Sequence, residues 1–194
     1  MTRIVMMGPP GVGKGTQAVR LAAALGVPSI STGDLFRAEV DNRTPLGLEL
    51  ESTISSGNYV PDDVTNQLVT ERLSAPDVVD GFILDGYPRT ILQVAELDRI
   101  LGSQLRRLDW CILLSADADH LVRRIIGRSA VQQRGDDDPE VIRHRIKVYE
   151  AETAPLAETY DERGILIRVD ASGPIDAISA EILDALAAAG RRDE

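Results

Sequence analysis

The sequence predicts an α/β fold, a doubly wound parallel sheet of five strands with helices on both of its faces. Five short apolar runs have the length and composition of buried parallel strands, and amphipathic helical patterns separate them. A chain of 194 residues is long enough for one such domain with a full core and too short for two ordinary domains. We therefore expect a single three-layer α/β/α domain over residues 1–194.

The expected strands are apolar runs too short for helices, and each is bounded by polar or turn-forming residues. Because both faces of a parallel sheet are covered by helices, such runs need not alternate apolar and polar residues. They are Arg3 to Met7, Pro28 to Ser31, Phe82 to Asp85, Trp110 to Ser115 and Leu166 to Asp170.

Helical periodicity predicts the crossovers between these strands. Caps support the boundaries, because Asp117 suits a helix N-terminus and Gly190 suits a helix end. The clearest helices span Lys14 to Leu25, Asp117 to Gly127, a segment that begins after Asp138-Pro139, and Ile175 to Ala188.

Two stretches do not fit simple crossovers. Residues Thr32 to Gly81 contain three helical patterns, broken at Thr44-Pro45 and between Ser56 and Pro61, which predicts an inserted helical subdomain. Residues Ser129 to Asp138 are polar and lack periodicity, so we expect a mobile surface loop there. The expected division is a core of 1–31, 61–128 and 139–194, an insertion of 32–60 and a loop of 129–138.

Composition limits the partners and the compartment. No apolar run approaches the length of a membrane span or a secretory signal, so we expect a cytoplasmic protein. A net charge of -10 argues against nucleic acids and anionic membranes as partners. Cys111 is the single cysteine, which excludes an internal disulfide and a cysteine-built zinc site. Without an obvious apolar outer stripe, a monomer is the default expectation.

A glycine-rich turn directly follows the first expected strand. Residues Gly8 to Thr16 read Gly-Pro-Pro-Gly-Val-Gly-Lys-Gly-Thr, and an apolar helix pattern comes next. Glycines let consecutive backbone N–H groups point inward, the helix adds its positive N-terminal end, and Lys14 supplies a charge for the outer phosphates. This combination predicts a phosphate cradle of the P-loop type, and hence a bound nucleoside triphosphate.

A second phosphate-reading group is expected at the same edge of the sheet. The third strand ends in Asp85, as in P-loop proteins that hold magnesium there, although an aspartate in this place could simply cap the next turn. Arg89 lies just beyond Asp85, and ligands of open α/β sheets bind at the carboxyl ends of the strands. This favours the magnesium role for Asp85.

These residues resemble the adenylate kinase family of nucleoside monophosphate kinases. Three segments are similar to the family's signatures in order and spacing: Gly8 to Gln17, Ser31 to Arg37, and Leu84 to Thr90 with Gln93. The resemblance implies a P-loop domain with a helical AMP-binding insertion, and that Gln93 reads the adenine edge. It implies that ATP is held by Gly11, Val12, Gly13, Lys14, Gly15, Thr16, Arg128 and Gly173, and AMP by Thr32, Arg37, the backbone of Asn58, Tyr59 and Val60, Gly86, Tyr87, Pro88, Arg89, Gln93, Arg134 and Arg145.

Four further arginines look like the family's catalytic set. Arg124 and Arg128 stand at i and i+4 of one expected helix, so both reach the same side. Arg134, in the expected loop, and Arg145, on the following helix, fall at the spacing of the family's lid arginines. Ion pairing with the nearby Asp136, Asp137 or Glu140 is the alternative for these side chains.

The chain departs from the general pattern in three places. Its loop of 129–138 is short, which places it in the short-lid branch and leaves no room for that family's long-lid zinc site. Gly15 replaces the hydroxyl residue that usually contacts Mg2+. The family shares this glycine, which implies magnesium held through waters ordered by Asp85. Tyr87 stands where phenylalanine is more frequent, and its hydroxyl has no assigned role.

The resemblance implies reversible phosphoryl transfer, MgATP + AMP giving two ADP, and so a role in adenine nucleotide balance. A UMP/CMP kinase is the alternative within the family, but Thr32 and Gln93 favour AMP. A regulatory ATPase is less favoured, because Gly86 rather than an acid follows Asp85. A GTP switch would need an Asn-Lys-x-Asp guanine reader, and no Asn-Lys pair occurs.

Overall fold

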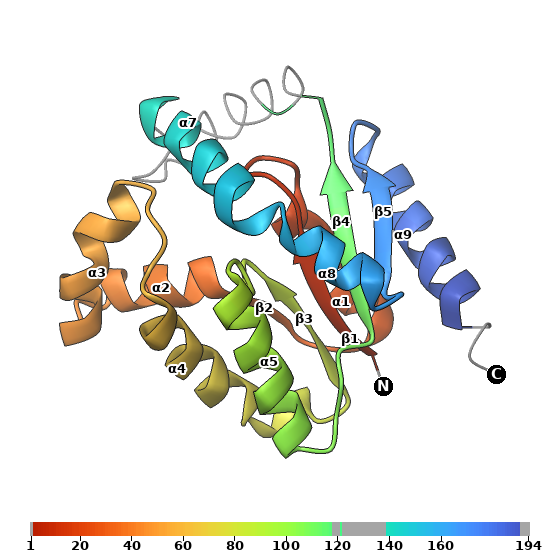
Figure 1. Ribbon diagram of the computed structural model, residues 1–194, viewed down its shortest axis with the longest axis horizontal. Helices are drawn as coiled ribbons and strands as arrows, with labels where there is room; N and C mark the ends of the chain where they lie inside the picture. Colours follow the sequence, from red (N-terminus) through yellow and green to blue (C-terminus); the bar gives the residue numbers. More distant parts are fainter. Residues whose placement is uncertain (1, 118–120, 122–138, 191–194) are drawn as a thin grey trace.

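Five parallel strands form one sheet in the order β2-β3-β1-β4-β5 (Figure 1). This computed structural model describes residues 2–117, 121 and 139–190. The predicted strands are confirmed to within one residue at each end, and so is the α/β fold class. The strands are β1 (Thr2–Met7), β2 (Ser29–Ser31), β3 (Gly81–Asp85), β4 (Trp110–Ser115) and β5 (Leu166–Asp170).

Helices cover both faces of the sheet, which gives the predicted three layers (Figure 1). On one face, α1 (Lys14–Leu25) and α9 (Ile175–Gly190) pack against side chains of β1, β3 and β4. On the other, α4 (Asp62–Leu73), α5 (Ile91–Ser103) and α8 (Leu156–Glu162) pack against the alternate residues of the same strands. The remaining elements are α2 (Thr32–Asp41), α3 (Pro45–Ser55), α7 (Pro139–Val148), the 3-10 turn η1 (Pro76–Val78) and the π-helical turn η2 (Tyr149–Thr153).

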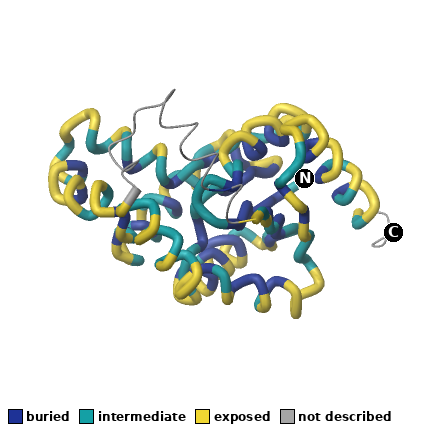
Figure 2. The backbone as a smooth tube through the Cα atoms, turned by 90° about the horizontal axis from the view of Figure 1, so that it is seen from above, coloured by how far each residue is buried: buried dark blue, intermediate teal, exposed yellow. Residues whose placement is uncertain are grey.

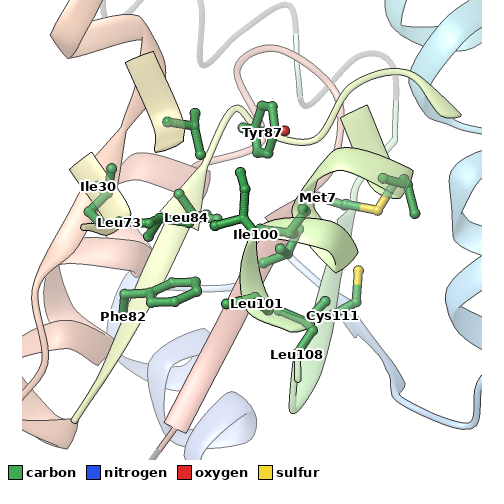
Figure 3. Close-up of a cluster of buried hydrophobic side chains, with 14 of the residues drawn as sticks. Met7, Ile30, Leu73, Phe82, Leu84, Tyr87, Ile100, Leu101, Leu108 and Cys111 are labelled. Atoms are coloured by element: carbon green, nitrogen blue, oxygen red, sulfur yellow. The ribbon is translucent and has the colours of Figure 1, made fainter. Parts of the chain in front are cut away.

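The period of two residues along each strand divides the core. In β1, Ile4 and Met6 belong to the cluster beneath α1 and α9, whereas Val5 and Met7 belong to the cluster beneath α5. Figure 3 shows Met7 and Cys111 within this second cluster. Burial raises the pKa of the Cys111 thiol, and the thiol behaves as a small apolar core group. Figure 2 shows the buried residues along the interior and the exposed residues on the outer turns.

Helices α2 and α3 project to one side of the sheet, at the left of Figure 1, and contribute to a small core against which α4 also packs. Phe36, Leu50 and Val60 are buried together there. Hydroxyl caps explain the helix starts, because Ser31 accepts from the Asp34 N–H and Thr44 from the Gly47 N–H. The three helical patterns predicted between the second and third strands are thus confirmed as α2, α3 and α4.

Gly47 is expected to be intolerant of any side chain. A Cβ atom on it would lie 2.0 Å from the carbonyl oxygen of Glu39, a backbone atom of α2 that has no room to move. Gly47→Ala should therefore lower the free energy of unfolding by about 3 kcal/mol, since α2 and α3 must separate. Chemical denaturation measures this, with Gly102→Ala on α5 as the control, because nothing lies within 4 Å of a Cβ at Gly102. Equal stability of the two variants would contradict the close approach.

The whole predicted lid of 129–138 lies outside the described residues, as do 118–120 and 122–128. The structure therefore does not address the loop at 129–138, most of the helix predicted from Asp117 to Gly127, or the positions of Arg124, Arg128 and Arg134. Leu121 is described, and its N–H donates to the Asp117 carbonyl as in a helical first turn. Among the described residues, none of the helices combines the length and apolar composition needed to cross a membrane.

Candidate functional site

The strand order brings three separate sequence motifs to one edge of the sheet. The register pairs Ser31 at the end of β2 with Asp85 at the end of β3, and Asp85 with Met6 of β1. The glycine-rich turn follows β1, and Thr32 follows β2 directly. Carboxyl ends of parallel strands share one edge, so the cradle, the start of α2 and the segment after Asp85 surround a common space.

The glycine-rich turn wraps around the ammonium group of Lys14. Its Nζ donates to the carbonyl oxygens of Gly8 at 2.8 Å and Pro9 at 3.0 Å. Gly13, the cap of α1, has φ 104, and no side chain caps this helix start. The turn thus needs the left-handed backbone that glycine allows, and the positive N-terminal end of α1 lies at the cradle.

The Asp85 carboxylate lies against the start of α1. A Cβ on Gly15 would sit 3.3 Å from Asp85 Oδ2, so the missing side chain keeps this approach open. No group of three or more His, Cys, Asp or Glu side chains that could hold a metal occurs in the part of the chain that the structure describes. The donor set fits a magnesium ion that takes most of its ligands from phosphate oxygens and waters.

A cavity of about 70 Å3 lies between the α2–α3 insertion and the edge of the sheet. Its walls come from three of the expected AMP segments, at the start of α2, before α4 and after β3. Thr32 Oγ1 donates to the Gly86 carbonyl at 3.0 Å, which joins two of these walls. The predicted AMP residues that line it are Thr32, Arg37, Asn58, Tyr59, Val60, Gly86, Arg89, Gln93 and Arg145.

A second cavity, of about 50 Å3, adjoins the cradle. Lys14, Arg89 and Arg145 all line it, although 75 and 56 residues separate them in turn along the chain. Gly86, Tyr59 and the two arginines line both cavities, so the two spaces meet at these side chains. The geometry therefore places three cations around the junction of the predicted triphosphate cradle and the cavity of about 70 Å3.

Arg89 is held in position from several sides. Its Nε donates to the Gly86 carbonyl at 2.7 Å, and its guanidinium carbon lies 4.7 Å from the centre of the Tyr59 ring. No described residue bonds its two terminal nitrogens, which leaves their N–H groups for the shared space. A guanidinium presents paired donors in a plane, the arrangement that suits phosphate oxygens.

A comparison with protein families identifies the type of site. A family model described as adenylate kinase matches residues 6–165. The chain belongs to the adenylate kinase family. This confirms the family resemblance carried by the three motifs.

Curated adenylate kinase relatives cover nearly the whole chain. A protein named adenylate kinase from Kocuria rhizophila is 54% identical over 186 residues, which span 96% of this chain and 99% of that protein. One from Clavibacter michiganensis is 50% identical over 192 residues, 99% of this chain and 96% of its own. One from Leifsonia xyli is 50% identical over 187 residues, which span 96% of this chain and 94% of that protein.

Several described residues of the predicted site line neither cavity, namely Gly11, Val12, Gly13, Gly15, Thr16, Asp85, Tyr87 and Gly173. Gly173 follows β5 at the same edge, but it lines neither cavity. Tyr87 is 1% exposed, and its hydroxyl donates to Asn66 Oδ1 at 2.8 Å and the Gln93 carbonyl at 3.2 Å. Burial raises the pKa of Tyr87, so this hydroxyl stays protonated and ties α4 to α5.

Thr153 is a site residue that the sequence analysis missed. Its hydroxyl donates to the Arg89 carbonyl at 2.9 Å and lies 2.8 Å from the Tyr59 hydroxyl. The Tyr59 ring in turn stacks on the Arg89 guanidinium. Thr153 and Tyr59, which contact each other, therefore hold the backbone and the side chain of Arg89. No sequence motif marks Thr153, because it stands 64 residues after Arg89 in a π-helical turn.

Helix α7 connects this site to the insertion, at the top of Figure 1. His144 Nε2 lies 2.6 Å from Asn58 Oδ1, and the Arg145 side chain passes so close to Gly57 that a Cβ there would be 2.7 Å from its Cγ. Gly57 also has φ +78, so both its backbone and its surroundings require glycine. These contacts bring Arg145 to both cavities.

A larger cavity lies elsewhere in the described residues. It has a volume of about 870 Å3 and opens at the amino ends of the strands, beside Thr2, Asp109 and Ile165. None of the predicted site residues lines it. Size alone therefore does not identify the site, whereas the convergence of cations and backbone donors does.

Proposed function

We propose that the protein catalyses reversible phosphoryl transfer, MgATP + AMP giving two ADP. The observation that carries the proposal is the meeting of the two cavities at Arg89 and Arg145, with Lys14 lining the cavity beside the cradle. A triphosphate in the cradle and a monophosphate in the cavity beneath the insertion would face each other across these cations. The names of the curated relatives, adenylate kinase, support the same reaction.

The proposed ATP site is built around the N-terminal end of α1. Backbone N–H groups of the cradle receive phosphate oxygens, and Lys14 neutralises the outer phosphates. From the sequence, Arg128 and the Gly173 backbone are assigned to the same nucleotide. The full set is Gly11, Val12, Gly13, Lys14, Gly15, Thr16, Arg128 and Gly173.

The proposed AMP site is the cavity of about 70 Å3 beneath the insertion. Arg37 and Arg89 would hold the phosphate, and Gln93 the base, because their side chains line its walls. Arg145 lines the same cavity, and Arg134 is assigned to AMP from the sequence. The full set is Thr32, Arg37, Asn58, Tyr59, Val60, Gly86, Tyr87, Pro88, Arg89, Gln93, Arg134 and Arg145.

For this reaction the protein must position two nucleotides and neutralise the negative charge of their phosphates. A loose phosphoryl transition state spreads negative charge over three equatorial oxygens, which the assigned cations stabilise. These are Lys14, Arg89, Arg124, Arg128, Arg134 and Arg145. No general base is assigned, because the attacking phosphate oxygen of AMP is already ionised at neutral pH.

Magnesium is the proposed cofactor, and zinc is not required. Asp85 would order waters around the ion, and Gly15 leaves the space between the carboxylate and the start of α1. When bound, the metal supplies additional charge neutralisation at the transferred phosphoryl group. The protein side chains supply in-line positioning.

We further propose that the chain works as a monomer in the cytoplasm, with a core of 1–31, 61–128 and 139–194, an AMP-binding insertion of 32–60 and a lid of 129–138. Phe36, Leu50 and Val60, the buried members of the small core, all lie within 32–60, which supports treating the insertion as a unit. Its closure with both nucleotides bound would exclude water from the phosphoryl group. Steady ATP hydrolysis without AMP, at a rate comparable to transfer, would contradict this gating.

A panel of acceptors tests the proposal. We expect AMP to exceed CMP, UMP and GMP in kcat/KM by about a hundred-fold with MgATP as donor, because a buried amide such as that of Gln93 rejects a mismatched base. Diphosphate formation is the readout. Preference for UMP or CMP would instead identify a pyrimidine monophosphate kinase, and phosphate release from ATP alone a regulatory ATPase.

A further inference from the structure

The side-chain amide of Gln93 is bound at both ends. Its Nε2 donates to Asp62 Oδ1 at 2.6 Å, and its Oε1 accepts from the backbone N–H of Arg89 at 2.8 Å. Gln93 is 2% exposed and lines the pocket proposed for AMP. The amide therefore has two partners that belong to the protein before any ligand enters.

The chemistry of these partners leaves one orientation for the amide. A carboxylate only accepts hydrogen bonds, and a backbone N–H only donates them. A flipped Gln93 would place its NH2 group against the Arg89 N–H and its oxygen against the Asp62 carboxylate. Both contacts would then be repulsive, so Nε2 must face Asp62 and Oε1 must face Arg89.

Asp62 also fixes the backbone that carries Gln93. Its second oxygen, Oδ2, accepts from the Thr90 hydroxyl at 2.7 Å, and Thr90 caps α5 by accepting from the Gln93 N–H at 3.2 Å. Asp62 is itself the first residue of α4, so the carboxylate lies at the starts of two helices. Positive helix ends stabilise a negative charge in this place.

The Gln93 amide can still form hydrogen bonds with one edge of a ligand base. Gln93 retains one N–H on Nε2 and one lone pair on Oε1, a donor beside an acceptor. Adenine presents a donor at its 6-amino group beside the N1 acceptor, whereas hypoxanthine presents an acceptor at O6 beside an N1–H donor. An amide fixed in one orientation pairs with only one of these two bases and opposes the other. An amide free to rotate could pair with both.

We infer that Asp62 is a positioning residue that fixes the Gln93 amide and thereby selects a 6-aminopurine monophosphate over a 6-oxopurine one. The inference rests on the proposed function, in which the pocket holds the acceptor nucleotide. Asp62 touches Gln93 and Thr90, and it sets the base preference through them.

The test compares two acceptors that differ at the 6-position. We would measure kcat/KM for AMP and for inosine monophosphate, with MgATP as donor, in the wild type, Asp62→Ala and Asp62→Asn. Asp63→Ala is the matched control, because Asp63 is the next residue of the same first turn, is exposed, and does not line the pocket. Thermal melting of each variant reports the structural effect separately.

We expect Asp62→Ala to lower the ratio of kcat/KM for AMP to that for inosine monophosphate by about ten-fold, the effect of losing one discriminating hydrogen bond. Asp62→Asn should lower it less, by about two-fold to five-fold, because its amide oxygen still accepts but its NH2 group can take the same place. Asp63→Ala should keep the wild-type ratio. In a Gln93→Leu background, removal of Asp62 should change the ratio no further.

An unchanged ratio in both Asp62 variants, with only a lower melting temperature, would overturn the inference and leave Asp62 a structural residue. If Asp62→Ala does not fold, an unchanged ratio in Asp62→Asn overturns it alone. A further fall in the ratio when Asp62 is removed from the Gln93→Leu protein would also contradict it. Failure of the wild type to phosphorylate AMP would instead refute the proposed function, which distinguishes the two.

Discussion

Lys14→Ala is expected to lower kcat/KM for phosphoryl transfer, with a loss of transition-state stabilisation of roughly 3 kcal/mol or more. This is the size of losing one preorganised charge at the transferred group. Lys14 Nζ lies in the cradle, bonded to the Gly8 and Pro9 carbonyl oxygens, and it lines the cavity that Arg89 and Arg145 share. Because it reaches the outer phosphates mainly as they gain charge, the loss should appear in kcat. Coupled-enzyme detection of ADP measures it.

Lys147→Ala is the matched control for this prediction. Lys147 is the only other lysine of the chain, lies exposed on α7 and lines neither cavity of the site. It should keep wild-type activity. Turnover like that of the wild type in Lys14→Ala would refute the assignment of the cradle, whereas a melting temperature lowered together with activity would show that Lys14 serves mainly to fold the turn.

Arg89→Ala should also lower kcat/KM, with a loss of transition-state stabilisation of about 3 kcal/mol, because Arg89 lies where both cavities meet. Part of the loss should appear as a raised KM for AMP, while the KM for MgATP changes little. Arg89→Lys should not restore activity, since an ammonium cannot both bond the Gly86 carbonyl, as Nε does, and offer paired donors beside the Tyr59 ring.

Arg99→Ala provides the comparison for Arg89. Arg99 is also on the segment after β3, but it lies 64% exposed on α5, paired with Glu96 one turn earlier. An exposed pair of this kind contributes little, so activity and stability should both stay near the wild type. A similar loss in Arg99→Ala and Arg89→Ala would mean that charge in general, rather than position, accounts for the effect.

The strands, the first helix and the cradle could be predicted because their signals are local. The run before Gly8 is apolar, Gly13 stands where the backbone turns left-handed, and the helix from Lys14 to Leu25 begins and ends as its pattern indicates. The cradle, Asp85 and Arg89 follow strand ends, and parallel strands share an edge. Most of the candidate site was therefore within reach of the sequence.

Contacts between segments distant in the sequence could not be predicted from it. The hydroxyl of Tyr87 had no assigned role until Asn66 of α4 was found opposite it. Thr153 belongs to no motif, and its place beside Arg89 depends on how η2 packs over the segment after β3. Hydrogen bonds of this kind depend on angles between packed helices, which periodicity along one segment does not encode.

The sequence by itself determined the strands, the helix starts, the family and which residues could hold phosphates, because each depends on neighbours within a few positions or on a motif of set spacing. Only the tertiary structure decided the order β2-β3-β1-β4-β5, the meeting of Lys14, Arg89 and Arg145, and the grip of Asp62 on Gln93. These are set by the simultaneous packing of two helical layers on one sheet, and a side chain acquires its partners only when that packing is complete.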